Sequence, residues 1–373
     1  MINLVQQFLR NGGTIADLAT RYFITGKRHA AHPNLVLLKY NQIESPFSDP
    51  LVQHSRGVIL DESNGWAMVA WPFNKFFNHG EGNAAVIDWT TARVQEKVDG
   101  SLCVVYFYDG DWHVATTGTP DACGVVNAEE FTFRELFWQT AAAMGLSFGQ
   151  SDSAMASGVV FFFELTTPFN KVVVQHKSAT LTLLGARFCR EGADDYGREL
   201  TPRDAMVWLD HPGDVLPVRE FPLQSIDDVL ATFSALSPLA QEGYVIVDSE
   251  CRRIKVKHPG YVHLHHLRDS FSPRAFVEIA RTGETSEVLT AFPEFAPTLA
   301  DYTRRIGDLC ADTEAHFGRL RDLPEQKAFA LEAVKTRFPA ALFLMRRKGV
   351  SARAVFAQLP IDSAMALINV RAA

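Results

Sequence analysis

Strand-like runs of residues fill the chain up to about residue 267, and helical periodicity replaces them afterwards. The runs are rich in β-branched and aromatic residues, and they are bounded by residues that favour turns. Strands are expected over Leu35–Tyr40, Ser55–Leu60, Leu102–Phe107, His113–Gly118, Gly158–Leu165, Val172–Gln175, Leu181–Phe188, Glu242–Asp248 and Arg253–Lys257. This order of elements favours an α+β protein in which a sheet-rich part precedes an all-α part.

Helices are expected at both ends of the chain and once between strands. Met1–Thr20 shows helical spacing that breaks at Gly12-Gly13, and Glu129–Met144 is amphipathic. The last part predicts helices over Pro273–Arg281, Pro297–Leu323, Glu325–Phe338, Ala340–Lys348, Ala352–Gln358 and Asp362–Val370. We therefore expect one domain over residues 1–267 and a helical domain over residues 268–373.

The charge balance limits the kinds of partner. A net charge of −7 without any long basic run means that a phosphate-binding site must be a local pocket. The chain has no run of about 18 uncharged apolar residues and no secretory signal pattern, so no membrane contact is expected. Five widely spaced cysteines favour reduced thiols and a cytoplasmic location over a disulfide framework or a zinc site.

Lys97 stands two residues before an Asp99-Gly100 turn that leads into the apolar run Leu102–Phe107. A lysine at the mouth of a strand becomes a nucleophile if its surroundings lower its pKa. A surface lysine that enters a hairpin produces the same short pattern. The rest of the chain must therefore decide between these two interpretations.

Single charges in apolar surroundings recur along the chain. Arg56 begins an apolar strand, Lys75 stands among aromatic residues, and Glu164 ends a strongly apolar strand. A buried charge is costly unless it has a partner, so each of these residues suggests a hydroxyl, a counter-ion or a bound anion or cation. The alternatives are an ion-paired arginine at the rim and a lysine that extends from the core towards water.

Lys255 and Lys257 alternate along a strand and therefore point to the same face. Two ammonium groups on one face repel unless an anion lies between them; a solvated basic strand face is the alternative. No G-x-x-x-x-G-K-[ST] loop is present to cradle a triphosphate. An enzyme that binds ATP through side-chain cations and attacks it with a lysine fits the assembled set of Arg56, Lys75, Lys97, Glu164, Glu242, Lys255 and Lys257.

These residues lie in motifs that resemble those of the covalent nucleotidyltransferases, and in particular the phage-type ATP-dependent single-strand RNA ligases of the tRNA-repair kind. The motifs, in order, are S-R-G-V-I-L, W-P-F-N-K-F-F-N, K-V-D-G-S, F-F-E-L, P-F-N-K-V-V, E-G-Y-V-I-V and K-V-K. The resemblance extends from about Tyr40 to His266. It implies a nucleotidyltransferase domain of packed antiparallel sheets with flanking helices, followed by an all-α C-terminal domain that adds substrate choice.

The resemblance also implies roles for individual residues. Lys97 would attack the α-phosphorus of ATP to form lysyl-AMP; AMP would pass to a 5′-phosphate RNA end, and a 3′-hydroxyl would displace it. Nucleotide contacts are implied for Tyr40, Arg56, Lys75, Glu96, Glu164, Glu242, Lys255, Lys257 and Tyr261. Contacts to Mg²⁺ or Mn²⁺ are implied for Glu164 and Glu242. Neighbouring cations would have to lower the pKa of the nucleophile well below its usual value.

Two positions depart from the family pattern. Thr117 stands where a basic residue often precedes the glycine of the return strand, and Val98 stands where the close phage relative carries an acid. Either change is expected to affect RNA-end binding or metal use. The expected partners are RNA ends, with nicked tRNA among them, and no obligate protein partner. Alternatives are a DNA ligase, a capping enzyme, or an inactive RNA-binding protein of the same fold.

Overall fold

The structure, a computed structural model, describes residues 2–126, 131–149, 158–169, 173–262, 272–282 and 295–370. The chain forms two compact units, Met1–Tyr261 and Val262–Ala373. The boundary predicted between residues 267 and 268 lies outside the described residues. No helix among the described residues has both the length and the apolar character needed to cross a bilayer.

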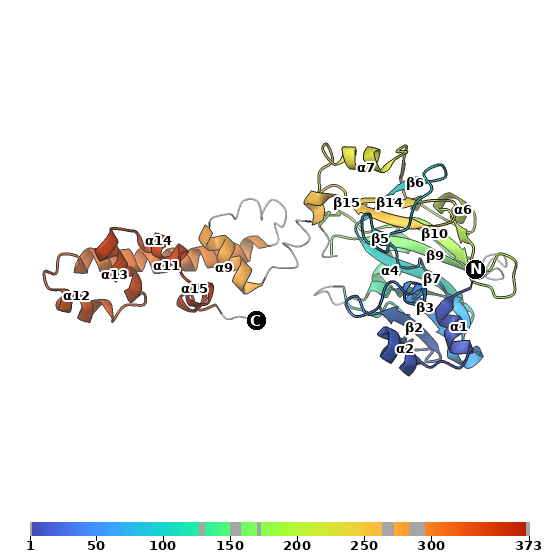
Figure 1. The fold of residues 1–373 in the computed structure, drawn as a ribbon, viewed down its shortest axis with the longest axis horizontal. Coiled ribbons are helices and arrows are strands. Elements are labelled where there is room, and N and C mark those ends of the chain that lie inside the picture. Colours follow the sequence, from blue (N-terminus) through green and yellow to red (C-terminus); the bar gives the residue numbers. More distant parts are fainter. Residues whose placement is uncertain are drawn as a thin grey trace. The chain divides into compact units, whose positions relative to one another are not determined.

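The first unit begins with a four-stranded antiparallel sheet and three short helices, drawn in blue in Figure 1. Its strands, in spatial order, are β1 (Ile24–Arg28), β2 (Leu35–Tyr40), β3 (Arg56–Asp61) and β4 (Ala67–Ala70). Its helices are α1 (Leu4–Arg10), α2 (Ile15–Tyr22) and α3 (Pro50–His54). The Asn3 side chain caps α1, and Thr14 with Asp17 forms a capping box on α2, so the predicted break at Gly12-Gly13 is confirmed.

A six-stranded sheet forms the centre of the first unit. Its elements are β7 (Ser101–Tyr108), β8 (Asp111–Thr116), β9 (Val159–Thr166), β10 (Thr180–Phe188), β11 (Glu199–Leu200) and β12 (Leu216–Pro217), with helices α4 (Phe133–Ala143) and α6 (Pro202–Met206). On β9, Val160 and Phe162 enter one core while Phe161 and Phe163 enter another. Because both faces of this strand are covered, its sequence is continuously apolar rather than alternating.

A five-stranded sheet completes the first unit. Its elements are β13 (Glu220–Phe221), β6 (Arg93–Glu96), β14 (Gly243–Val247), β15 (Arg253–Lys257) and β5 (Phe77–Asn78), with helix α7 (Ile226–Thr232) packed nearby. Strand pairing in all three sheets is antiparallel except for β10 with β12 and β15 with β5. The predicted α+β class with packed, largely antiparallel sheets is therefore confirmed.

One predicted strand is wrong. Residues 173–175, within the expected strand Val172–Gln175, form bends and a loop instead. The backbone amides of Val173 and Val174 both donate to Oδ2 of Asp99, each at 3.0 Å. A side chain thus takes the hydrogen bonds that a neighbouring strand would otherwise accept, and the apolar sequence does not form a strand.

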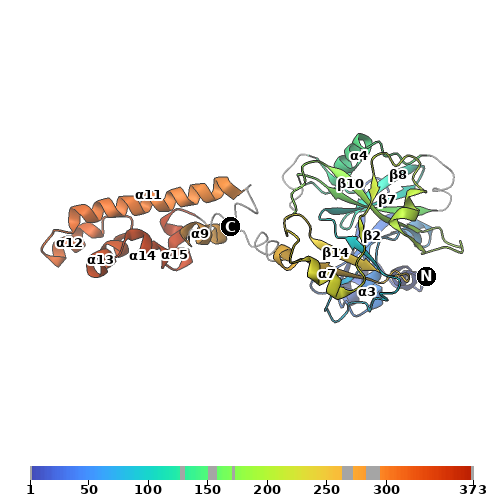
Figure 2. The same cartoon turned by 90° about the horizontal axis from the view of Figure 1, so that it is seen from above.

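The second unit is helical, as predicted. Its helices are α9 (Pro273–Thr282), α11 (Ala296–Leu320), α12 (Gln326–Ala333), α13 (Pro339–Lys348), α14 (Ala352–Ala357) and α15 (Ile361–Leu367). Figure 2 shows α11 as the long helix along whose side the shorter helices pack. Pro339 occupies the first turn of α13, where its missing N–H costs no hydrogen bond.

Candidate active site

The backbone around Lys97 is held firmly between two sheets. Lys97 lies in the short segment between β6 and β7, and its amide donates to the carbonyl of Gly243 at 2.9 Å. A Cβ at Gly100 would lie 2.5 Å from the carbonyl oxygen of Leu165, so only glycine fits this turn. The Asp-Gly pair after the lysine therefore brings β7 back against β9 and fixes where the lysine side chain begins.

The side chain of Asp99 fixes the same segment through hydrogen bonds to other parts of the chain. It is buried, and while Oδ2 accepts the two amides near residue 173, Oδ1 accepts the hydroxyl of Tyr261 at 2.9 Å. Tyr261 is only 2% exposed. The structure thus places Tyr261, predicted beside the nucleotide, in a buried contact that supports the segment carrying Lys97.

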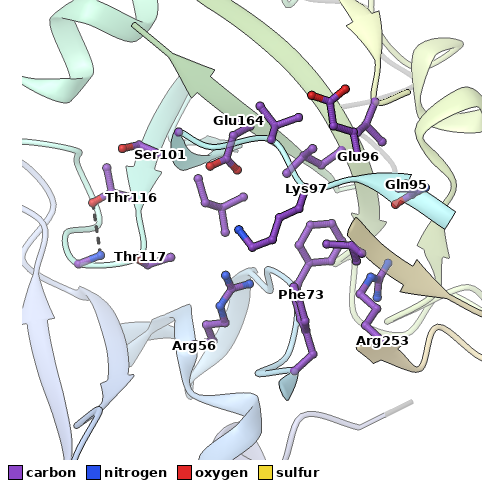
Figure 3. Close-up of a pocket in the computed structure, with 18 of the residues that line it drawn as sticks. Arg56, Phe73, Gln95, Glu96, Lys97, Ser101, Thr116, Thr117, Glu164 and Arg253 are labelled. Carbon is purple, nitrogen blue, oxygen red and sulfur yellow. Dashed lines mark hydrogen bonds between the residues drawn. The ribbon is translucent and has the colours of Figure 1, made fainter. Parts of the chain in front are cut away.

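Lys97 projects into a cavity of about 530 Å³ whose walls come from all three sheets (Figure 3). Four predicted site residues line it: Arg56, Glu96, Lys97 and Glu164. The additional lining residues with polar or aromatic side chains include Lys39, Phe73, Phe76, Gln95, Ser101, Thr116, Thr117 and Arg253. The structure therefore brings residues from distant parts of the sequence around one amine.

Glu242 connects two of the predicted lysines. Its Oε2 lies 2.5 Å from Nζ of Lys97, and its Oε1 lies 2.8 Å from Nζ of Lys257. The carboxylate is 3% exposed, and Gly243 beside it pairs with Lys257 across β14 and β15. One buried carboxylate thus holds two ammonium groups, and both of its oxygens are engaged.

Lys255 lies on the same face of β15 as Lys257, as the alternation predicts. Burial, followed by the charges of Lys75, Lys257 and Lys97, lowers the pKa of Lys255 to about 8. No carboxylate forms an ion pair with Lys255 in the part of the chain that the structure describes. A bound anion would relieve this crowding of positive charge.

Lys75 lies in an aromatic cage. Its Nζ lies 5.3 Å from the ring centroid of Tyr40, 4.9 Å from that of Phe47 and 5.6 Å from that of Phe77. Burial and the Arg56 charge lower the pKa of Lys75, and burial raises the pKa of Tyr40. The aromatic faces stabilise the ammonium group.

Arg56 and Glu164 approach Lys97 from opposite walls. Figure 3 shows the Lys97 amine, the Arg56 guanidinium and the Glu164 carboxylate directed into the same space, whereas the Glu96 carboxylate points away from the amine. Nη1 of Arg56 is buried and has no hydrogen-bond partner among the described residues. Burial raises the pKa of Glu164 to about 7, opposed by the Lys97 charge, and burial also raises the pKa of Glu96.

Two charged cavity residues were missed in the sequence. Arg253 lies over the ring of Phe73, and its Nη2 donates to Oε2 of Glu199 at 2.5 Å; Glu199 also pairs with the fully buried Arg187. Arg253 precedes Lys255 by two residues, so the alternation that singled out the lysine pair would also have found it. Lys39, the other, was visible as the one charge in the apolar strand Leu35–Tyr40.

The fold and the cavity together define an α+β protein in which side chains from three sheets surround a single amine, that of Lys97. Residues 54–261 match the RNA ligase family, and the chain belongs to that family. It is therefore an enzyme of the RNA ligase class, and the predicted relationship to phage-type RNA ligases is confirmed.

Individual relatives show how far the similarity extends. The chain is 25% identical over 325 residues to an RNA ligase of Rhodothermus phage RM378, covering 73% of each protein. It is 26% identical over 315 residues to a protein of Autographa californica nuclear polyhedrosis virus named as a bifunctional polynucleotide kinase/RNA ligase, covering 80% of this chain and 43% of that one. A solved archaeal ATP-dependent RNA ligase is 15% identical, covers 83% of both chains and has a TM-score of 0.49.

Proposed function

We propose that this chain is an ATP-dependent RNA ligase that joins 5′-phosphate and 3′-hydroxyl RNA ends through a lysyl-AMP intermediate and an RNA-adenylate. The observation that carries the proposal is the Lys97 amine, which is directed into the cavity at 2.5 Å from the buried Glu242 carboxylate. Lys75 and Lys255 are close enough to interact electrostatically, and neither forms an ion pair with a carboxylate among the described residues. Nη1 of Arg56 is buried and has no hydrogen-bond acceptor among these residues. A triphosphate supplies acceptors for all three.

In the first step, the Lys97 amine attacks the α-phosphorus of ATP. An N–P bond forms while the bond between the α-phosphorus and its bridging oxygen breaks, and pyrophosphate leaves with that electron pair. The lysine must first give up a proton, and Oε2 of Glu242 is the acceptor within hydrogen-bonding distance. Lys255, Lys257 and Arg56 would stabilise the negative charge that develops on the phosphates.

The next two steps transfer AMP and then release it. An oxygen of the RNA 5′-phosphate attacks the phosphorus of lysyl-AMP, the N–P bond breaks, and the amine recovers a proton. The RNA 3′-hydroxyl then attacks the 5′-phosphorus, loses its proton to solvent, and displaces AMP. The net result is one phosphodiester bond, one AMP and one pyrophosphate for each ATP.

We propose a divalent cation as a partner of the phosphates in this cavity. No group of three or more His, Cys, Asp or Glu side chains suited to a metal occurs among the described residues. Glu164, whose pKa is raised by burial although the charges of Lys97 and Arg56 lower it, is the residue we propose for Mg²⁺ or Mn²⁺, with phosphate oxygens and water as the other ligands. Such an ion would neutralise negative charge on the phosphates. Glu242 remains a predicted ligand, although lysines engage both of its oxygens.

We further propose that the helical unit helps to choose the RNA, that nicked tRNA is a substrate, and that the enzyme is cytoplasmic. The five free cysteines agree with a reducing compartment. Tyr40, Glu96 and Tyr261 are proposed as supports of the nucleotide site, Tyr261 through Asp99.

Transfer of label from nucleotide to protein tests the proposal. The wild-type protein, Lys97→Ala and the control Lys177→Ala, which removes an exposed lysine of the same unit, are incubated with Mg²⁺ and either ATP or GTP labelled at the α-phosphate. Label from ATP is expected on the wild type and the control and absent from Lys97→Ala. Label from GTP alone would indicate a capping enzyme, and no label would indicate an inactive RNA-binding protein.

A strand-joining assay distinguishes an RNA ligase from a DNA ligase. A 5′-phosphorylated single-stranded RNA is expected to be circularised or joined by the labelled enzyme. Sealing of nicked duplex DNA in preference to RNA would contradict the proposal and identify a DNA ligase.

A further inference from the structure

Lys39 lines the cavity but has no role in the steps described above. It is half-buried on β2 and lies opposite Arg56 in the register of β2 and β3. No ion pair or hydrogen bond engages its amine within the described part of the chain. Burial, then the charges of Lys27 and Arg56, lowers the pKa of Lys39. A lysine without a counter-ion beside an arginine is costly unless a ligand supplies negative charge.

The β2 and β3 wall meets the end of β8 at this corner of the cavity. Gly57 follows Arg56, and a Cβ at Gly57 would lie 3.4 Å from Cα of Thr117, so the start of β3 lies directly against Thr117. The side chains of Ser101, Thr116 and Thr117, which line the same cavity, are neutral. The positive charge at this corner therefore comes from Lys39 and Arg56.

We propose that Lys39 and Arg56 form a paired phosphate-binding site, because they are register partners on β2 and β3 at a corner where the side chains of Ser101, Thr116 and Thr117 are neutral. The inference rests on the proposed ligase function. The ligand is a phosphate group with free oxygens, either an outer phosphate of ATP or the 5′-phosphate of an RNA end. Both carry oxygens that accept from an ammonium and a guanidinium group at once.

Lys39→Met removes the charge and keeps most of the apolar stem, which separates phosphate binding from packing. Lys27→Met, which removes an exposed charge on the neighbouring strand β1, is the matched control. Three steps are measured separately: AMP transfer from ATP to the enzyme, AMP transfer from the isolated lysyl-AMP enzyme to a 5′-phosphorylated RNA, and sealing of a pre-adenylylated RNA. A loss of about tenfold or more is expected for Lys39→Met and little change for Lys27→Met.

The step affected identifies the phosphate. A higher KM for ATP in the first step indicates an outer phosphate of ATP. A slower second step with normal ATP use indicates the 5′-phosphate of RNA. Lys39→Arg is expected to retain most activity in either case, and Lys39→Met combined with Thr117→Lys is expected to recover part of it, because the charge returns to the same corner from the opposite wall.

Two binding probes keep this inference separate from the ligase proposal. Pyrophosphate and a 5′-phosphorylated oligoribonucleotide are titrated by calorimetry, with the 5′-hydroxyl oligonucleotide as reference, and thermal melting confirms that each variant is folded. If the wild type accepts no label but Lys39→Met still weakens one probe about tenfold, the ligase proposal fails and the phosphate site stands. If folded Lys39→Met matches Lys27→Met in every step and with both probes, the phosphate site is overturned.

Discussion

Oε2 of Glu242 lies 2.5 Å from Nζ of Lys97, while the other oxygen of the same carboxylate lies 2.8 Å from Nζ of Lys257. The carboxylate therefore does two things at once: it can take the proton of the nucleophile, and it holds two like charges side by side. The chemistry of this cavity and its electrostatic balance depend on the same buried residue.

Replacing Glu242 with Gln is expected to slow AMP transfer to the enzyme about 100-fold or more, because the amine loses its nearest proton acceptor. Rates of label transfer under single-turnover conditions measure the effect. Glu250→Gln, an exposed glutamate after the end of β14, serves as the control and should be unaffected. Equal rates for Glu242→Gln and wild type would exclude Glu242 as the base.

Glu164 should make the stability of the first unit fall as pH rises. Its pKa is raised to about 7, so between the unfolded value of 4.5 and about 7 the folded state binds more protons than the unfolded state. The stability that the protonated group contributes is present below about pH 4.5 and lost as pH rises through 7. Thermal unfolding of wild type and Glu164→Gln over this range should show the variant gaining by a few degrees at the upper end.

Stabilisation by a divalent cation tests whether Glu164 binds the metal. If the carboxylate binds Mg²⁺ or Mn²⁺ together with nucleotide, the ion and ATP should stabilise wild type more than Glu164→Gln. A pH profile that is the same for both proteins would show that folding does not raise the pKa of Glu164.

The charge of Lys255 is expected to lower the folding stability of the protein while it favours phosphate binding. Its pKa is lowered to about 8, so between about 8 and the usual 10.5 the unfolded state binds more protons and folding stability rises with pH. Lys255→Met is therefore expected to be more stable than wild type near pH 7 and to lose this advantage towards the usual lysine pKa. Urea unfolding at several pH values measures the difference, with Lys177→Met as control.

The same Lys255→Met protein should transfer AMP at least about tenfold more slowly, because a charge-assisted contact to phosphate is lost. A variant that is both more stable and fully active would contradict a phosphate role for Lys255.

The hydroxyl of Tyr261 is expected to contribute to folding stability through its hydrogen bond to Asp99. Tyr261→Phe removes the hydroxyl that donates to Asp99 at 2.9 Å and leaves a buried carboxylate oxygen without that donor. A loss of about 1–3 kcal/mol in the free energy of unfolding is expected. Tyr22→Phe, whose hydroxyl has no hydrogen bond among the described residues, is the control in chemical unfolding. A changed KM for ATP without any loss of stability would instead place the hydroxyl on the nucleotide.

Local pattern predicted most of the secondary structure, and it marked Lys97 as either a nucleophile or a surface lysine that enters a hairpin. Periodicity and turn residues predicted the strand-rich part and the helices of the C-terminal part, because these signals depend on neighbours a few residues away. The Lys97 and Asp-Gly pair was visible for the same reason, and the alternation of Lys255 and Lys257 predicted their shared face. Where a distant side chain captured the backbone, as Asp99 does near Val173, the local prediction of a strand was wrong.

The sequence by itself determined which residue types are present and the periodicity that gives each strand its two faces. Only the tertiary structure decided that Glu242 lies between two lysines, that Tyr261 contacts Asp99, and that Lys39 and Arg253 face the cavity. These relationships join residues far apart in the chain, and they depend on how three sheets pack. Charge balance inside a cavity is a property of that packing, because burial and distance set the strength of each interaction.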